Sequence, residues 1–424
     1  MKSLALGILA ICCVFAAESE SLLLRNGTVH PVSGPEIGPA SVLIQDGKIA
    51  AVGRGVRAPR GARVIDVKGL HVYPGMIDSA TQVGLSEIGS VKETSDVTEI
   101  ADFSPQLRSL IAINPASDHI PVARANGLTS VIALPAGGIV SGQAALVHLD
   151  GWTWEEMRIR GSAAMHVQFP TIQFRPSRGR PRPSDAPKTF KEAQEKYQEQ
   201  LRQLDEFFEH ARRYERAKSA GAAGFQPDVK YEAMIPVLKR ELPVVATAIR
   251  RREIRAVLDF AGKQSIRLIL ARPRQVQEFL PELKEKDIPV VLGPTLALPL
   301  EEDDPYDSSY ALPAEIHQAG VRIAFATFSS SNSGNLPYQA AMAVAFGLPQ
   351  EVALRAVTLS AAEIWGVAEE LGSIEVGKVA DLIITDGDPL ETRTQIKILI
   401  INGREVDPAA NKHYRLYQEY KDRK

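Results

Sequence analysis

The sequence predicts an α/β protein in which a closed (β/α)8 barrel of the TIM type is joined to a small β-sandwich built from both termini. Short β-branched segments with Asn-Gly and Asp-Gly hairpin signals fill residues 20–67 and return at 380–389 and 396–406. Between these ends, apolar strands alternate with amphipathic helices, a pattern typical of a parallel sheet covered by helices. The length of 424 residues favours closure of that sheet into an eight-stranded barrel.

The predicted domain boundaries follow the same changes in pattern. Residues 19–73 and 372–424 form the composite β-sandwich domain, and residues 74–371 form the barrel with an insertion at 171–218. Within the barrel, strands are expected at 127–135, 165–170, 241–248, 266–273, 288–294 and 321–327. Helices are expected at 251–264, 276–287, 313–320, 336–348 and 349–366.

The insertion has two parts. Residues 174–187 are rich in proline and arginine, which excludes regular structure there. This segment is either a solvated loop or a set of arginines that grip an acidic ligand. Apolar residues three or four apart follow, which predicts one long helix over 189–218.

The N-terminus indicates export. Lys2 precedes a short apolar run that ends in small residues, as in a signal peptide over residues 1–18. The run is too short to span a bilayer comfortably, and a buried N-terminal helix is the alternative. We therefore expect a periplasmic or secreted protein that has no membrane contact after cleavage. Cys12 and Cys13 are the two cysteines of the chain, so the mature protein has no disulfide and no thiolate.

The overall composition is that of an ordinary soluble globular protein. Hydrophobic residues make up 45% of the chain and charged residues 24%. The formal net charge of -2 indicates neither nucleic acid nor an acidic membrane as a partner.

Two blocks near the chain ends carry a family pattern. The front block contains "ASVLIQDGKIAAVG" and "ARVIDVKGLHVYPGMID", and the rear block contains "GSIEVGKVADLIITDGDPL" and "INGREV". With residues 123–157 and 335–349, they resemble the amidohydrolase superfamily, and within it the imidazolonepropionase-like proteins. The resemblance implies a (β/α)8 barrel with a β-sandwich, and metal-assisted hydrolysis of a C–N bond in a cyclic amide.

The metal ligands that the resemblance implies are missing from the sequence. The family carries His-x-His after the first barrel strand, one histidine after each of the fifth and sixth strands, and an Asp after the eighth. The His-x-His positions hold Ala80 and Gln82, and the fifth-strand position holds Thr247. The sixth-strand position holds Arg272 or Ala271, and the eighth-strand position holds Phe328, with Thr327 and Ser329 beside it. Zinc prefers imidazole and thiolate ligands, and a guanidinium cannot ligate. No metal cofactor is therefore expected; the alternative is one divalent metal, such as zinc, at a rebuilt site.

Other residues are candidates for the site. Asp78 is either a catalytic carboxylate or a structural one, and His166 is the histidine best placed for the barrel mouth, or a structural one. Residues 137–143 read as a Gly-rich turn whose amides face a ligand. Acidic loops at 87–102 and 301–310 are either solvated or able to hold a hard cation. The residues expected to contact a ligand at the barrel mouth are Gln82, Ser141, Gln143, Thr247, Arg272 and Phe328.

Two functions remain open. The protein is either an exported pseudoenzyme, which acts as a binding protein or as the partner subunit of an active homologue, or an active hydrolase of non-peptide C–N bonds with relocated or partner-supplied ligands. In both cases we expect a small-molecule ligand at the barrel mouth. The expected assemblies are a homodimer or a heteromer with an active homologue, and the helix at 189–218 is a candidate contact.

Overall fold

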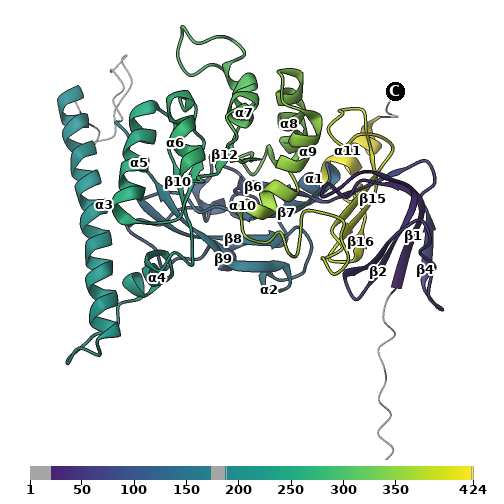
Figure 1. Cartoon of the computed structure of the whole chain (residues 1–424), viewed down its shortest axis with the longest axis horizontal. Coiled ribbons are helices and arrows are strands. Elements are labelled where there is room, and N and C mark those ends of the chain that lie inside the picture. Colours follow the sequence, from purple (N-terminus) through teal and green to yellow (C-terminus); the bar gives the residue numbers. More distant parts are fainter. Residues whose placement is uncertain (1–20, 173–186, 188, 422, 424) are drawn as a thin grey trace, which may run out of the picture.

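The computed structural model describes residues 21–172, 187, 189–421 and 423. The expected signal peptide and nearly all of the arginine-rich segment 174–187 lie outside the described residues. Two eight-stranded sheets organise the rest. Figure 1 shows the barrel with its helices at one side and the sheet built from the two chain ends at the other. The predicted fold class is confirmed.

Both ends of the chain build one sheet. Strand β14 pairs antiparallel with β5, with Leu382 opposite Pro74, and so joins the C-terminal strands to the N-terminal ones. The expectation of a β-rich unit made from both termini is therefore confirmed. Its strands are β1 (Ser21–Val29), β2 (Ile37–Gln45), β3 (Lys48–Gly53), β4 (Arg63–Asp66), β5 (His71–Pro74), β14 (Leu382–Thr385), β15 (Ile396–Ile401) and β16 (Arg404–Val406).

The second sheet is the barrel wall, and its strands neighbour one another in chain order. Its last strand is followed at once by residues that bond to the first: the Phe328 N–H donates to the Ala80 carbonyl at 2.8 Å. This contact brings the two edges together. The strands are β6 (Met76–Thr81), β7 (Leu128–Ala133), β8 (Val140–His148), β9 (Arg158–Gln168), β10 (Val244–Thr247), β11 (Leu268–Ala271), β12 (Val290–Leu292) and β13 (Ile323–Phe325).

Strand β8 departs from the predicted parallel order. It pairs antiparallel with both β7 and β9. Only residues 134–139 connect β7 to β8, and so short a connection permits an antiparallel neighbour but not a parallel crossover. The reading of residues 137–143 as one Gly-rich turn was also wrong, because the strand already begins at Val140.

Helices cover the outside of the barrel (Figure 1). The predicted helix over 251–264 matches α5 with the same bounds, and residues 349–366 divide into two helices. The helices are α1 (His119–Ala125), α2 (Trp154–Met157), α3 (Phe190–Ser219), α4 (Val229–Leu238), α5 (Arg251–Gln264), α6 (Leu280–Glu285), α7 (Ser308–Gln318), α8 (Leu336–Ala345), α9 (Gln350–Ala356), α10 (Leu359–Ile364) and α11 (Lys412–Tyr420).

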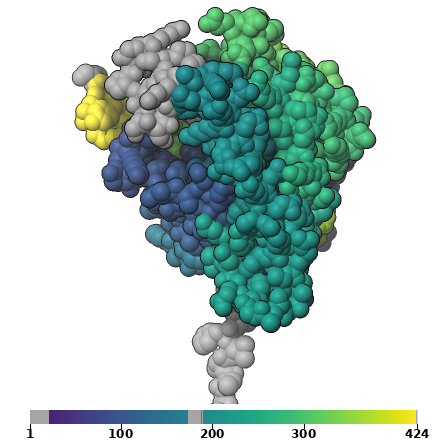
Figure 2. Space-filling view, turned by 90° about the vertical axis from the view of Figure 1, so that its left-hand side faces the viewer, coloured from purple at the N-terminus to yellow at the C-terminus, as the bar shows by residue number. Residues whose placement is uncertain are grey.

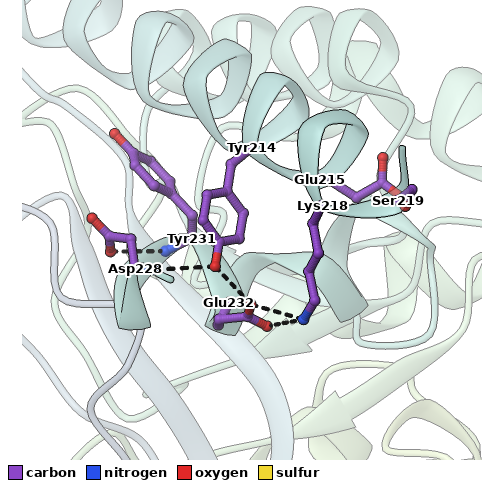
Figure 3. A network of polar contacts seen from close by, with 7 residues as sticks. All are labelled: Tyr214, Glu215, Lys218, Ser219, Asp228, Tyr231 and Glu232. Atoms are coloured by element: carbon purple, nitrogen blue, oxygen red, sulfur yellow. Dashed lines mark hydrogen bonds and ion pairs between the residues drawn. The ribbon is translucent and has the colours of Figure 1, made fainter. Parts of the chain in front are cut away.

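Helix α3 confirms the predicted long helix and lies at the end of the molecule opposite the terminal sheet (Figure 1). In Figure 2 it is the teal column of the face turned to the viewer. Its lower end is tied to α4, as Figure 3 shows. The carboxylate of Glu232 on α4 accepts from the Tyr214 hydroxyl at 2.6 Å and from the Lys218 ammonium at 2.6 and 2.7 Å.

Small and branched side chains from all eight strands fill the barrel interior, as a closed barrel of this size requires. No helix among the described residues has the length and apolar character needed to cross a membrane. The interior residues are Ile77, Ala80, Ile132, Ala144, Ala164, Val245, Ile269, Ala271, Val291, Ala324 and Ala326.

Candidate ligand-binding site at the barrel mouth

The barrel mouth lies where the parallel strands end. Thr247 closes β10, Arg272 follows β11, and Thr327 and Phe328 come shortly after β13. Because the carboxyl ends of parallel strands meet at one rim, the barrel closure gathers residues that are far apart in the sequence. The mouth therefore combines the positions at which the sequence analysis expected the family ligands.

Asp78 links the first barrel strand, β6, to residues that follow the last one, β13. One carboxylate oxygen accepts from the N–H groups of Ala80, at 3.2 Å, and Thr327, at 3.0 Å, and the other accepts from the Thr327 hydroxyl. The residue is fully buried. Burial raises the pKa of Asp78 to about 7, although these three hydrogen bonds act in the opposite direction. Both oxygens face protein donors, so this carboxylate joins the first strand to the last rather than facing a ligand.

His166 is held in one tautomer by its two partners. Its Nδ1 lies 2.6 Å from the Pro135 carbonyl, which can only accept, so Nδ1 carries the proton. Its Nε2 lies 3.0 Å from the Thr247 hydroxyl and therefore accepts from it. Burial lowers the pKa of His166 to about 4, so the imidazole is neutral near pH 7. Two of the expected site residues are thus bonded to each other.

Arg272 and Phe328 meet above the barrel interior. The guanidinium carbon of Arg272 lies 5.1 Å from the centroid of the Phe328 ring, within the range of a cation–π contact. Both residues have left-handed backbone, with φ of 61° and 51°. Burial and the positive charge of Arg274 lower the pKa of Arg272, yet a guanidinium in a protein stays protonated near neutral pH. Among the described residues, no acceptor or carboxylate pairs with this guanidinium.

The other candidates are placed differently. Gly142 on β8, not its neighbours, is the cross-strand partner of His166. Since side chains alternate along a strand, Ser141 and Gln143 lie on the opposite face from His166. The Gln143 amide donates to the Pro105 carbonyl at 2.9 Å, so it secures the loop before α1. Gln82 follows β6 at the rim and is partly buried.

The residues at the mouth do not fit a zinc ion. The positions where the family carries ligands hold a methyl group, an amide, a hydroxyl already bonded to His166, a guanidinium and a phenyl ring. A tetrahedral zinc site needs at least three nitrogen, sulfur or carboxylate ligands. Within the described part of the chain, no group of three His, Cys, Asp or Glu side chains is arranged to hold a metal. Sequence reasoning found these positions but missed the pairing of Thr247 with His166.

The acidic loops do not alter this picture. Glu93, Asp96 and Glu99 are exposed to solvent in the loop after β6. In the loop after β12, Glu301 forms an ion pair with Arg250. These carboxylates are solvated or paired, and none points to a cation site.

A cavity of about 750 Å³ lies next to α3 and α5. It is bounded by the first turns of α3 and the N-terminal end of α5, and none of the mouth residues lines it. Its arginines are largely paired with carboxylates: Arg251 with Glu278, and Arg255 with Glu282. Arg252 in this wall is exposed.

A family match and a solved structure both relate this chain to amidohydrolases. Residues 165–406, more than half of the chain, match the Amidohydrolase family. An amidohydrolase from Thermotoga maritima has the same fold, with a TM-score of 0.78 and 25% sequence identity over 91% of this chain and 99% of that one.

Two curated relatives match over different lengths. Amidohydrolase tasK of Hapsidospora irregularis is 23% identical over 385 residues, which are 82% of this chain and 38% of tasK. The chain thus spans well under half of that relative. The imidazolonepropionase of Sphingopyxis alaskensis is 46% identical over 79 residues, which are 17% of this chain and 19% of that protein. The family match and the shared fold place this chain in the amidohydrolase family, a family of hydrolases that are usually metal-dependent.

Proposed function

We propose that this protein is a pseudoenzyme of its family, which binds a small organic molecule at the barrel mouth without metal-assisted hydrolysis. One observation carries the proposal: Arg272 stacks on Phe328 at two positions where the family's metal ligands are expected. A fixed positive charge there repels a divalent cation. A scaffold that keeps its mouth but not its ligands is suited to binding.

The remaining polar groups do not supply a replacement catalyst. Asp78 has the pKa of a general base near neutral pH, but its two oxygens are occupied and it is fully buried. His166 uses both ring nitrogens on Pro135 and Thr247. These residues therefore hold the shape of the mouth. Arg272 and the partly buried Thr247 and Gln82 are left to orient a ligand.

A hydrolase with relocated or partner-supplied ligands is the alternative, and the family membership favours it. An assay for ring opening of hydantoin, a five-membered cyclic amide, distinguishes the binding protein from the hydrolase. The assay is run with added Zn²⁺ or Mn²⁺ and with a chelator. The proposal predicts no opening of the ring above the buffer rate in any of these mixtures. Metal-dependent hydrolysis that the chelator abolishes would establish the alternative. An active hydantoin-opening enzyme, assayed in parallel, controls for substrate and metal quality.

Export and assembly remain proposals. The sequence pattern of residues 1–18, which is typical of a signal peptide, supports a periplasmic or secreted protein. Cell fractionation of the full chain tests this: recovery in the cytoplasm with the N-terminus intact would contradict export. A homodimer or a heteromer with an active homologue is tested by the mass of the purified protein in solution. Substitution of Arg202 and Lys191 on the exposed side of α3 shows whether that helix forms the contact.

A further inference from the structure

The arginines of this protein that are withdrawn from solvent normally have partners. Arg124 donates to the Leu149 carbonyl and faces Asp150 at 3.4 Å. Arg274 donates to the Leu298 carbonyl at 2.8 Å and to the Ser309 hydroxyl. Arg255 grips the carboxylate of Glu282 with two bonds at 2.7 and 3.0 Å. A partly buried guanidinium without a partner is therefore a local exception.

Arg272 is that exception. Among the described residues its guanidinium has no hydrogen bond or ion pair and lies against the Phe328 ring, and the positive charge of Arg274 adds to burial in lowering its pKa. A guanidinium withdrawn from water without an acceptor destabilises the folded protein. The left-handed backbone at Arg272 adds strain of the kind that collects at ligand sites. A bound anion that pairs with the guanidinium would offset both the unpaired charge and the backbone strain.

The surroundings restrict the kind of anion. The guanidinium fork matches two oxygens in one plane, which is the geometry of a carboxylate. Phe328 provides an apolar surface beside the fork, and so favours an anion that carries an organic body. One strand away, the Thr247 hydroxyl donates its hydrogen bond to His166, so its oxygen lone pairs stay available to a ligand N–H.

We propose that the barrel mouth recognises the carboxylate of a small organic acid through bidentate hydrogen bonds from the Arg272 guanidinium. The inference rests on the proposed function and adds the ligand class. It assigns Arg272 as the residue that determines specificity and Phe328 as the wall against which the body of the acid packs.

Benzoate and benzamide form a matched pair for the test, because they have the same size and shape and differ in charge. Titration calorimetry on the full-length mature chain is expected to show that benzoate binds at least about tenfold more tightly than benzamide. R272Q removes the charge and is expected to lose that preference. R272K keeps a charge without the fork and is expected to retain only part of it.

R252Q is the matched control, since Arg252 is an exposed arginine in the cavity next to α3 and α5. It should leave benzoate binding unchanged. The inference is overturned if benzoate fails to bind, if its affinity survives R272Q, if R252Q abolishes it, or if inorganic phosphate binds as tightly as benzoate at the same place. Equal binding of benzamide and benzoate would also overturn it, while the proposed function, which depends on the hydantoin assay, would stand.

Discussion

The guanidinium carbon of Arg272 lies 5.1 Å from the centre of the Phe328 ring, although 56 positions separate the two residues in the sequence. Each follows a different barrel strand, and each holds a left-handed backbone that is unfavourable for a residue with a side chain. Barrel closure brings them together at the mouth. The pair places a guanidinium beside an aromatic ring at two positions where the family resemblance implies metal ligands.

The first prediction is that Arg272, which is proposed to bind the ligand, lowers the free energy of unfolding of the ligand-free protein. R272Q removes the partly buried charge and should raise the free energy of unfolding in urea. R272G also relieves the left-handed backbone and should raise it by about 1 kcal/mol more than R272Q does. If either variant is less stable than the natural chain, Arg272 stabilises the fold and its charge carries no cost in the free protein.

A second prediction concerns the buried carboxylate of Asp78. Its pKa of about 7 in the folded protein lies above the ordinary value of 3.8, so folding favours the protonated form. The free energy of unfolding should therefore fall as pH rises from about 4 to 7 through this group, by a few kcal/mol. D78N keeps an oxygen for the two N–H groups and removes the charge. Its free energy of unfolding, measured in urea at each pH, should rise relative to that of the natural chain as pH rises to 8. A difference between the two chains that stays constant across the range would contradict the raised pKa.

A third prediction concerns the tautomer of His166. Its pKa of about 4 lies below the ordinary 6.5, so the stability it contributes is complete above pH 6.5 and is lost as pH falls toward 4. Nitrogen-15 NMR should show a neutral ring protonated at Nδ1 from pH 5.5 to 8. T247V removes the hydroxyl that donates to Nε2 and should lower the free energy of unfolding by about 1–3 kcal/mol. A ring protonated at Nε2 would contradict the bonding to Pro135.

The fourth prediction concerns Gly293, which follows β12. A Cβ at this position would lie 1.8 Å from the Ala326 carbonyl oxygen, and the backbone φ is 142°. G293A should therefore lower the free energy of unfolding by at least about 2 kcal/mol or prevent folding, because the backbone at residue 293 must move away from the backbone at Ala326. The matched control is G34A, where an added methyl meets nothing within 4 Å. Equal thermal unfolding of the two variants would show that β12 and β13 do not approach as described.

The sequence predicted those parts of the fold that depend on local signals. Asp46-Gly47 and Asn402-Gly403 lie at the turns β2–β3 and β15–β16, whereas the Asn26-Gly27 pair lies inside β1 and forms no hairpin turn. The spacing of Tyr197, Leu204 and Phe208 marks the buried face of α3. Strand β8 escaped detection because it follows two glycines and is buried along its whole length, so it shows no alternation.

The family spacing points to Thr247, Arg272 and Phe328 as ligand-contacting residues, and that role stays a prediction. In the structure Thr247 ends β10, Arg272 follows β11, and Phe328 comes shortly after β13. Their partners come from elsewhere: His166 lies on the neighbouring strand, and Thr327 bonds to Asp78 across 249 positions. Such pairings depend on barrel closure and on left-handed backbone angles, which no local pattern reports.

Metal content tests the central claim most directly. The mature protein should be purified without a histidine tag, loaded with zinc, manganese or iron, passed through a desalting column and measured by mass spectrometry of the elements. The account predicts that each metal remains far below one ion per chain, since a guanidinium and a phenyl ring stand at two ligand positions. Retention of zinc, manganese or iron near one ion per chain would contradict it.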